Sequence, residues 1–423
     1  MPENDFSSSQ IANTSLGASG IRDTVIVVAV LLGLSALLLL GMLIEQLAVF
    51  LGIIAAIVAL AIIYSRAPKL RATVTRAFEN KRTFATLLIV LLLAAYPILL
   101  RDNPYLIHIG ALAAIYTIMA LGLNITLGYA GLLDIGFAVY FGVGAYTSAQ
   151  FAIHFGMSFW LSLIFGGLFA SFFGFLIAWP ALRVQDHYLG LVTLGYGLMM
   201  NLLARNVYFL TNGTDGVINI PPPSIGSFEF TRALDLGFLK LPFQANFYYL
   251  GVAFALVAAF ISYRLQQSKL GRSWDAIRED EIAAKCSGVD TRGLKILAFS
   301  MGAFFGGIGG AIYAHMVGFV SPENFTFLES INILVMVVIG GAGNILGVVF
   351  GAVFFIVLPE RFREFEHFRL LFFGLALILL MINRPEGIFP RLRKRRMLSA
   401  EKMQSLLAKS SEKSPKAAPT RAQ

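Results

Sequence analysis

Charged residues are scarce in this chain of 423 residues, and cysteine is nearly absent. Only 13% of the residues are charged and 57% are hydrophobic, with a mean hydropathy of +0.75, whereas about a quarter of the residues of soluble domains are charged. This composition excludes an ordinary soluble fold and indicates a protein of the lipid bilayer. The single cysteine, Cys286, excludes an intramolecular disulfide, and the lack of a CxxC or Cys/His spacing argues against a structural metal or iron–sulfur site.

Catalytic motifs are also missing. The sequence has no GxxxxGK[ST] phosphate loop, so the chain is not expected to hydrolyse ATP by that chemistry. GxSxG, HExxH and kinase signatures are absent, and the five histidines are scattered along the chain. We therefore predict that this chain is not a membrane enzyme and that it has no metal and no cofactor of its own.

Long apolar runs dominate what remains. Runs such as Leu87 to Leu93 do not alternate between apolar and polar residues, as the strands of a porin would. We expect an all-α polytopic membrane protein with about 10 to 12 transmembrane or half-spanning helices. The candidate spans are residues 25–44, 47–64, 83–100, 105–129, 132–153, 158–180, 189–205, 247–263, 296–317, 331–358 and 370–383.

Basic residues in the loops predict the orientation. The segment 66–82 holds six basic residues against one acid, and the loop 264–295 holds seven basic residues, so the positive-inside rule places both in the cytoplasm. The segment 206–246 has two basic residues against three acids and is expected outside. Both termini then lie inside, provided that the stretch 331–358 turns back within the membrane or makes two short spans.

These observations divide the chain into four regions. Residues 1–24 are predicted to form a disordered cytoplasmic tail, and residues 25–100 form accessory N-terminal spans. Residues 101–390 are expected to form the membrane core, which includes the cytoplasmic loop 264–295. Residues 391–423 form a basic cytoplasmic tail.

Glycines recur at four-residue spacing within the apolar segments. This spacing lets helix backbones approach closely, and packing is the favoured interpretation. Breaks near residues 128–136 and 340–343 could also line a pathway, because irregular backbone at membrane depth is tolerated only where it is buried or faces water. Asp134 is interpreted as the N-cap of a helix that starts near Ile135, in preference to a group that faces the pathway. The candidate packing or pathway residues are Gly128, Gly131, Asp134, Gly302, Gly306, Gly310, Gly340, Gly341, Gly343 and Gly347.

The loop 264–295 contains an amphipathic segment. A helix of about four turns is predicted, capped by Ser273 and ended by Gly288. Several acids in this segment would be repelled by anionic lipid headgroups, so a protein partner is favoured over the lipid surface. The candidate contacts are Trp274, Ile277 and Ala284 on one side, Arg278 and Glu281 as polar groups, and Gly288 at the end.

Five stretches resemble one family. They are ALGLNITLGYAGLLDIGFAVYFGVGAYTSA (120–149), YLGLVTLGYG followed by LTNGTDGVINIP (188–221), GRSWDAIREDEIAAKCSGV (271–289), GFVSPENFTFLESINILVMVVIGGAGNILG (318–347) and RPEGIFP (384–390). These motifs are similar to the LivM-type permease subunits of bacterial high-affinity branched-chain amino acid ABC importers, over about residues 105–390.

The resemblance implies an assembly in the bacterial inner membrane. It would contain a second homologous permease subunit and two ATP-binding cassette ATPases, which supply the ATP chemistry, together with a periplasmic amino-acid-binding protein; membrane lipid is a further partner and nucleic acid is not. The loop 264–295 would carry a coupling helix that docks on an ATPase. The expected cargo is leucine, isoleucine and valine. Alternatives are a urea or short-chain amide ABC permease and, from another class, an ion-coupled secondary carrier.

Overall fold

The computed structural model describes residues 80–181, 186–226, 228–235 and 240–361, together with isolated positions between 23 and 35 and between 374 and 389. The predicted tails (1–24 and 391–423) and the predicted spans at 25–44, 47–64 and 370–383 lie almost entirely outside the described residues. The predictions for these regions therefore stay predictions.

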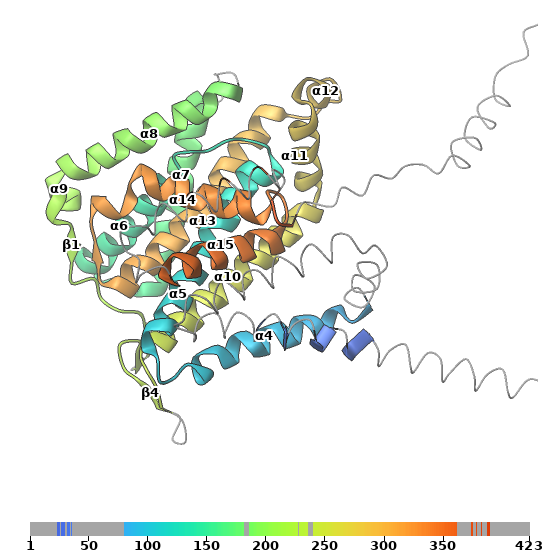
Figure 1. Ribbon diagram of the computed structural model, residues 1–423. Coiled ribbons are helices and arrows are strands. Elements are labelled where there is room, and N and C mark those ends of the chain that lie inside the picture. The colour runs from blue at the N-terminus through green and yellow to red at the C-terminus, as the bar shows by residue number, and fades with distance from the viewer. Residues whose placement is uncertain are drawn as a thin grey trace, which may run out of the picture. The chain divides into compact units, whose positions relative to one another are not determined.

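Helices make up most of the described chain (Figure 1). They are α4 (Arg82–Leu99), α5 (Pro104–Leu123), the π-helix η1 (Asn124–Tyr129), α6 (Ala138–His154), α7 (Phe159–Ala181), α8 (Asp186–Asn206), α9 (Tyr208–Thr211), η2 (Gly213–Asp215), α10 (Gln244–Gln267), α11 (Lys269–Glu279), α12 (Glu281–Cys286), α13 (Thr291–Val317), η3 (Pro322–Phe325), α14 (Phe327–Gly340) and α15 (Ile345–Arg361). The strands are β1 (Val217–Ile218), β2 (Ser224–Ile225), β3 (Phe228–Glu229), β4 (Leu234–Asp235), β5 (Lys240–Leu241) and β6 (Phe319–Val320).

Several helices have the length and the composition of membrane spans. Among the described residues, the continuous helix of α5 and η1, and α7, α10 and α13, are long and apolar enough to cross a bilayer, and α4, α14 and α15 are shorter apolar helices. These helices coincide with predicted spans. The structure therefore agrees with an all-α membrane protein.

Helix α7 carries the exposed hydrophobic face expected against lipid. Trp160 near its start and Trp179 near its end are 36% and 49% exposed. Their separation of 19 positions corresponds to about 29 Å at a rise of about 1.5 Å per residue, close to the ~30 Å of a bilayer core. Tryptophans at both interfaces are typical of a spanning helix.

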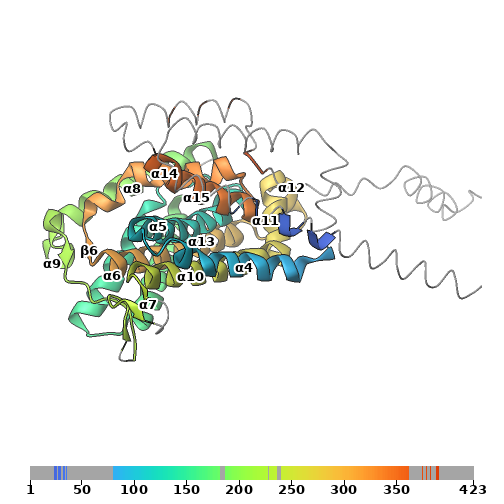
Figure 2. The ribbon, with the colours of Figure 1, turned by 60° about the horizontal axis from the view of Figure 1, so that its bottom comes forward.

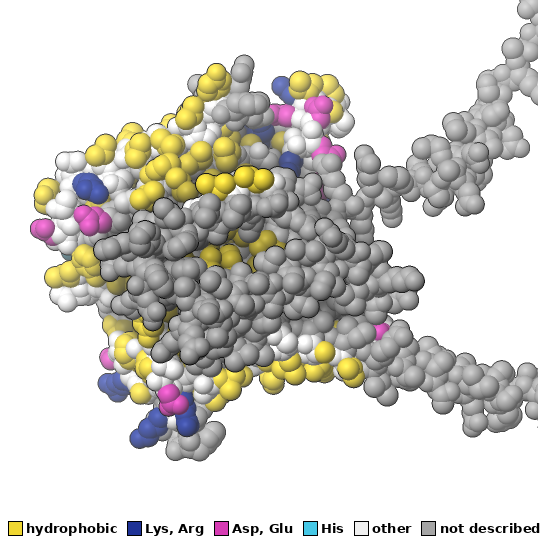
Figure 3. Space-filling view, viewed as in Figure 1, with side chains coloured by type: hydrophobic (Ala, Val, Ile, Leu, Met, Phe, Trp, Pro, Cys, Tyr) yellow, Lys and Arg dark blue, Asp and Glu magenta, His cyan; other side chains and the backbone are white. Residues whose placement is uncertain are grey.

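The two ends of the helical bundle differ from each other. Helices α11 and α12 lie at one end, and β1, β6 and α9 lie at the other (Figures 1 and 2). At the latter end β1 pairs antiparallel with β6, which brings Val217 opposite Val320 and joins the 206–246 segment, which is predicted to face outside, to the segment that follows α13. On the face shown in Figure 3, charged side chains gather near α12, near α9 and near β4, and hydrophobic side chains lie over α8 and along α4.

Glycines of α13 make close contacts with two neighbouring helices. A Cβ at Gly302 would lie 2.9 Å from the carbonyl oxygen of Gly122 in α5, and a Cβ at Gly310 would lie 2.0 Å from the carbonyl oxygen of Phe141 in α6. At Gly306 a Cβ would lie 3.1 Å from the Cβ of Tyr140 in α6. Gly302 and Gly310 therefore lie where α13 packs closely against the backbones of α5 and α6, and Gly306 lies against side chains of the same neighbourhood.

The segment between η1 and α6 differs from the prediction. Helix α6 starts at Ala138 and not near Ile135, and its first turn has no side-chain cap. The buried Asp134 instead accepts a hydrogen bond from the N–H of Gly136 through Oδ1 at 3.1 Å, within an irregular segment. Its interpretation as a helix N-cap is therefore wrong. Side chains from elsewhere bind the freed backbone groups: Thr193 Oγ1 accepts from the N–H of Ile135, and Ser330 Oγ accepts from the N–H of Ala138.

A second break separates α14 from α15, as the glycine pattern predicts. Helix α14 ends at Gly340 and α15 begins at Ile345. Between them Gly341 and Gly343 adopt φ values of 106° and 91°, which favour glycine over other residues. A Cβ at Gly340 would lie 2.2 Å from the carbonyl oxygen of Gly347, so the two helices pack tightly beside the break.

Candidate functional site

The loop between α10 and α13 folds as two helices rather than the one predicted. Ser268, not Ser273, caps α11, and its side chain accepts from the N–H of Gly271 at 3.3 Å. Asp280 has extended backbone and caps α12 by accepting from the N–H of Ala283 at 2.9 Å. The single helix over 273–288 is therefore wrong, because Asp280 ends one helix and starts the next. Gly288, with a φ of 82°, follows α12.

The apolar side of the predicted amphipathic helix faces the protein itself. Trp274 is 0% exposed, and Ile277 and Ala284 are also buried. The indole Nε1 of Trp274 donates to the carbonyl oxygen of Leu294 in α13 at 2.8 Å. These three residues therefore fix α11 and α12 to the bundle.

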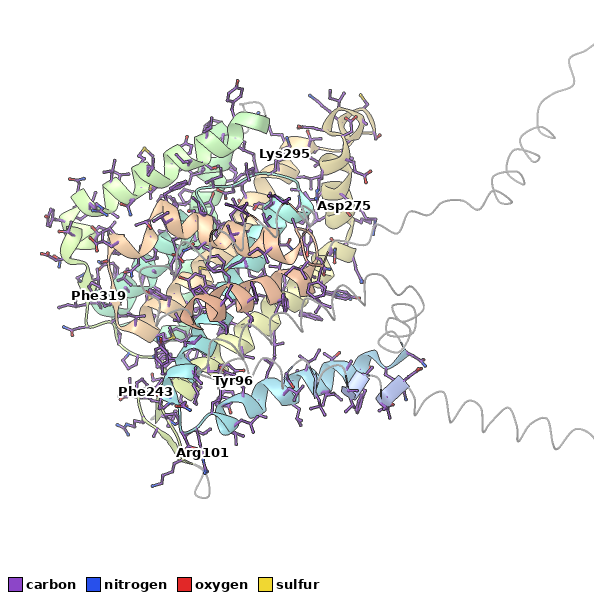
Figure 4. All side chains as sticks on the ribbon, viewed as in Figure 1. Tyr96, Arg101, Phe243, Asp275, Lys295 and Phe319 are labelled. Carbon is purple, nitrogen blue, oxygen red and sulfur yellow. The ribbon has the colours of Figure 1, made fainter. Side chains whose placement is uncertain are left out.

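An ion pair makes a second attachment to α13. Glu281 Oε2 lies 2.5 Å from Lys295 Nζ, and the side chain of Lys295 is only 7% exposed. Figure 4 places Lys295 at the end of the bundle where α11 lies, close in the view to Asp275, and far from Phe319. A buried ammonium needs a charged partner, and Glu281 supplies one.

The outer side of α12 remains open in this chain. Ile282 is 77% exposed, and the residues around it are exposed too. This exposed surface, which we call the α12 surface, comprises Ile282, Ala283, Lys285, Cys286, Ser287 and Gly288.

Arg278 joins α11 to the first helix break. Its Nη1 donates a hydrogen bond to the carbonyl oxygen of Gly128 in η1. Its side chain also crosses Gly131, where a Cβ would lie 2.7 Å from Arg278 Cγ. Gly131 has a φ of 73°, so glycine is favoured here both by the backbone and by the arginine above it.

The two helix breaks meet next to this contact. Asn124 Oδ1 accepts from the N–H of Gly343 at 2.7 Å, and a Cβ at Gly128 would lie 2.5 Å from the nitrogen of Gly343. Gln266, in the last turn of α10, donates through Nε2 to the carbonyl oxygen of Gly343 at 3.0 Å. Both breaks therefore lie against the corner at which α10 turns into α11.

The sequence alone does not identify the roles of three of these residues. Gln266 and Lys295 lie in the loop 264–295, where a polar or charged residue indicates only a surface position, and Asn124 is a polar residue within an apolar run. An amide at the point where an apolar helix meets a glycine-rich stretch was an available signal for Asn124. Nothing local identifies the partner of Gln266, because Gly343 lies 77 positions away.

A buried polar cluster lies toward the opposite end of α13. His315 Nδ1 donates to the carbonyl oxygen of Pro221 at 2.6 Å, so its Nε2 accepts from the hydroxyl of Ser148 at 2.9 Å. Ser162 lies beside Ser148, with their oxygens 3.1 Å apart. This cluster fastens the 206–246 segment to the bundle and gives His315 a structural explanation.

Comparisons with known proteins bear on the whole core. A family model for the permease component of branched-chain amino acid transport systems matches residues 105–382. The high-affinity branched-chain amino acid transport system permease protein LivM of Escherichia coli K12 is 35% identical over 326 residues, covering 74% of this chain and 76% of that protein. LivM of Salmonella typhimurium is 33% identical over 299 residues, covering 68% and 70%.

A more distant relative has another stated cargo. The autoinducer 2 import system permease protein LsrC of Escherichia coli is 29% identical over 194 residues, covering 44% of this chain and 51% of that protein. No solved structure matches the chain. Since the family model covers more than half of the chain and the LivM similarity extends over about three quarters of it, this chain belongs to the family of permease components of branched-chain amino acid transport systems.

Proposed function

We propose that this chain is one permease subunit of an ABC importer that carries leucine, isoleucine and valine across the bacterial inner membrane. The observation that carries the proposal is the similarity to LivM of Escherichia coli along 74% of the chain. The apolar helices of the structure agree with a membrane location. In this proposal both termini and the loop 264–295 face the cytoplasm.

The energy for transport comes from partner subunits. Two ATPases bind in the cytoplasm, a second permease subunit completes the pathway, and a periplasmic binding protein delivers the amino acid. The similarity to a permease protein of a transport system supports this division of tasks. The chain itself needs only to bind these partners and to change conformation.

The α12 surface is the proposed ATPase contact. Trp274, Ile277 and Ala284 are buried against the chain itself, and Glu281 is paired with Lys295, so these residues position the loop. The exposed Ile282 and its neighbours are left to enter a cleft in the ATPase. A rigid element held in such a cleft is sufficient to transmit a domain movement.

Transport by the assembled complex tests the proposal. The chain is purified with the two ATPases and the second permease of the proposed complex, reconstituted in vesicles, and supplied with ATP, the proposed binding protein and labelled leucine. We expect uptake that requires ATP and that isoleucine and valine reduce by competition. Competition by urea or acetamide but not by valine would favour the amide permease, and uptake by the chain alone under an ion gradient would favour a secondary carrier.

A further inference from the structure

Two polar side chains of the α10–α11 corner bind backbone at the two helix breaks. Arg278 donates to the carbonyl oxygen of Gly128, at the first break. Gln266 donates to the carbonyl oxygen of Gly343, at the second. The two acceptors lie 215 positions apart in the sequence, whereas the two donors lie only 12 positions apart.

The acceptor at the first break, the carbonyl of Gly128, lies in the last turn of η1, and the acceptor at the second, the carbonyl of Gly343, lies in the turn between α14 and α15. Carbonyl groups in the last turn of a helix lack partners within the helix and carry partial negative charge. A guanidinium bound to such a carbonyl makes a charge-assisted hydrogen bond, which is stronger than a neutral one. Because Arg278 and Gln266 bind the backbone itself, a displacement of the corner acts directly on the path of the chain at both breaks.

The two breaks are also joined to each other. Asn124 Oδ1 accepts from the N–H of Gly343, and Asn124 is 0% exposed. Gly128 has no room for a side chain, since a Cβ would lie 2.0 Å from Asn124 Oδ1. The breaks therefore form one close-packed unit, and breaks in helices are the points at which spans bend most easily.

We propose that Arg278 and Gln266 are positioning residues. They pass the movement of the loop 264–295 to the two helix breaks. Asn124 makes both breaks move together, so that α5 and the α14–α15 pair shift as one at the cytoplasmic side of the pathway. This inference rests on the proposed function, in which the loop docks on an ATPase. It gives Arg278 a role within the chain, in place of a contact with the ATPase.

Arg272 provides a matched control on the same helix. It is exposed, and its Nη1 donates to the carbonyl oxygen of Gln267 without reaching a break. The test compares Arg278→Met, Arg278→Lys, Gln266→Leu and Arg272→Met in the full complex in vesicles. Leucine uptake and ATP hydrolysis are measured together, with subunit composition as the check on assembly.

We expect Arg278→Met to keep its ATPase subunits and its ATP hydrolysis while leucine uptake per ATP falls about tenfold, the factor that corresponds to about 1.4 kcal/mol. Gln266→Leu should lower the same ratio, Arg278→Lys should restore part of it because a cationic donor is retained, and Arg272→Met should match the wild type. A normal ratio in both Arg278→Met and Gln266→Leu would overturn the inference.

A spectroscopic measurement separates transmission from general damage. In a Cys286→Ser background one nitroxide label is placed at Lys269→Cys, which is exposed at the start of α11 and outside the α12 surface, and in a separate variant another is placed at Leu133→Cys, beside the first break, where the side chain is 37% exposed. Vanadate trapping of nucleotide should change both spectra in the wild type. In Arg278→Met only the label at position 269 should respond; a response at position 133 as large as in the wild type would contradict the inference.

These measurements distinguish a failure of the proposed function from a failure of the inference about Arg278 and Gln266. If the wild-type complex takes up no leucine with ATP, the cargo or importer assignment is wrong whatever the variants do. The two label responses then still report whether Arg278 links the loop to the break, because they require nucleotide binding and not leucine.

Discussion

Asn124 and Gly343 lie 219 positions apart, and Oδ1 of Asn124 accepts a hydrogen bond from the N–H of Gly343 at 2.7 Å. This bond joins the π-helix at the end of α5 to the turn between α14 and α15. Both are places where a span loses its regular hydrogen bonds, and each supplies the other with a partner. Irregular backbone within the membrane is stable only when its polar groups are bound in this way.

Substitutions on the buried side of α11 and α12 should lower the stability of the subunit, and substitutions on the exposed side should weaken ATPase docking. Trp274→Ala removes a fully buried indole and its hydrogen bond to Leu294, and we expect it to destabilise the fold by about 3–5 kcal/mol. Ile282→Asp changes a side chain that is 77% exposed and should leave the thermal midpoint of the purified subunit unchanged.

Co-purification completes this comparison. Ile282→Asp should lose its ATPase subunits, because an unpaired carboxylate would enter an apolar contact. An Ile282→Asp subunit that retains the ATPases and full uptake would show that the α12 surface is not the docking site.

Removing Glu281 and removing Lys295 from their ion pair should lower the thermal stability by different amounts. Glu281→Gln leaves the ammonium of Lys295, which is 7% exposed, without its carboxylate, whereas Lys295→Met leaves a carboxylate that is 37% exposed and can be hydrated. We therefore expect Glu281→Gln to lower the thermal midpoint more than Lys295→Met does. The double variant should recover part of the loss. Equal effects of the two single substitutions would argue that the pair is not buried in the assembled protein.

Glycine substitutions should follow the space around each glycine. Gly310→Ala would place a Cβ 2.0 Å from the carbonyl oxygen of Phe141 and force α13 away from α6, so expression and thermal stability should fall. Gly195→Ala in α8 meets nothing within 4 Å and should be neutral or stabilise the helix by about 0.5–1 kcal/mol. The measurement is the thermal midpoint in detergent, and a reversed order would contradict the packing.

Cysteine labelling should report the orientation of the chain. Thr214→Cys in a Cys286→Ser background is exposed in the η2 turn and should react with an impermeant thiol reagent added to intact cells. Ser321 is only 7% exposed, so Glu323→Cys is the better second position on that side. The native Cys286 should react only after the membrane is opened. Labelling in the opposite order would invert the topology.

Two residues that the loop sequence predicts as contacts with a partner protein bind groups within the chain itself. Arg278 and Glu281 look like surface charges in an amphipathic helix, and a partner protein is the natural interpretation. In the folded chain Arg278 binds Gly128 and Glu281 binds Lys295. Asp280, by contrast, carried a local signal for the helix break, since aspartate is a favoured N-cap residue.

The sequence by itself determined the membrane environment, the core spans and the place of the α14–α15 break, because hydropathy, helix length and glycine spacing are local properties. Only the tertiary structure decided which face of α11 is buried, where α6 begins and which side chains bind the two breaks. These depend on hydrogen bonds and packing between segments up to 219 positions apart. A backbone N–H or carbonyl group that has no partner within a helix can form a hydrogen bond with any suitable polar side chain that the fold brings near it.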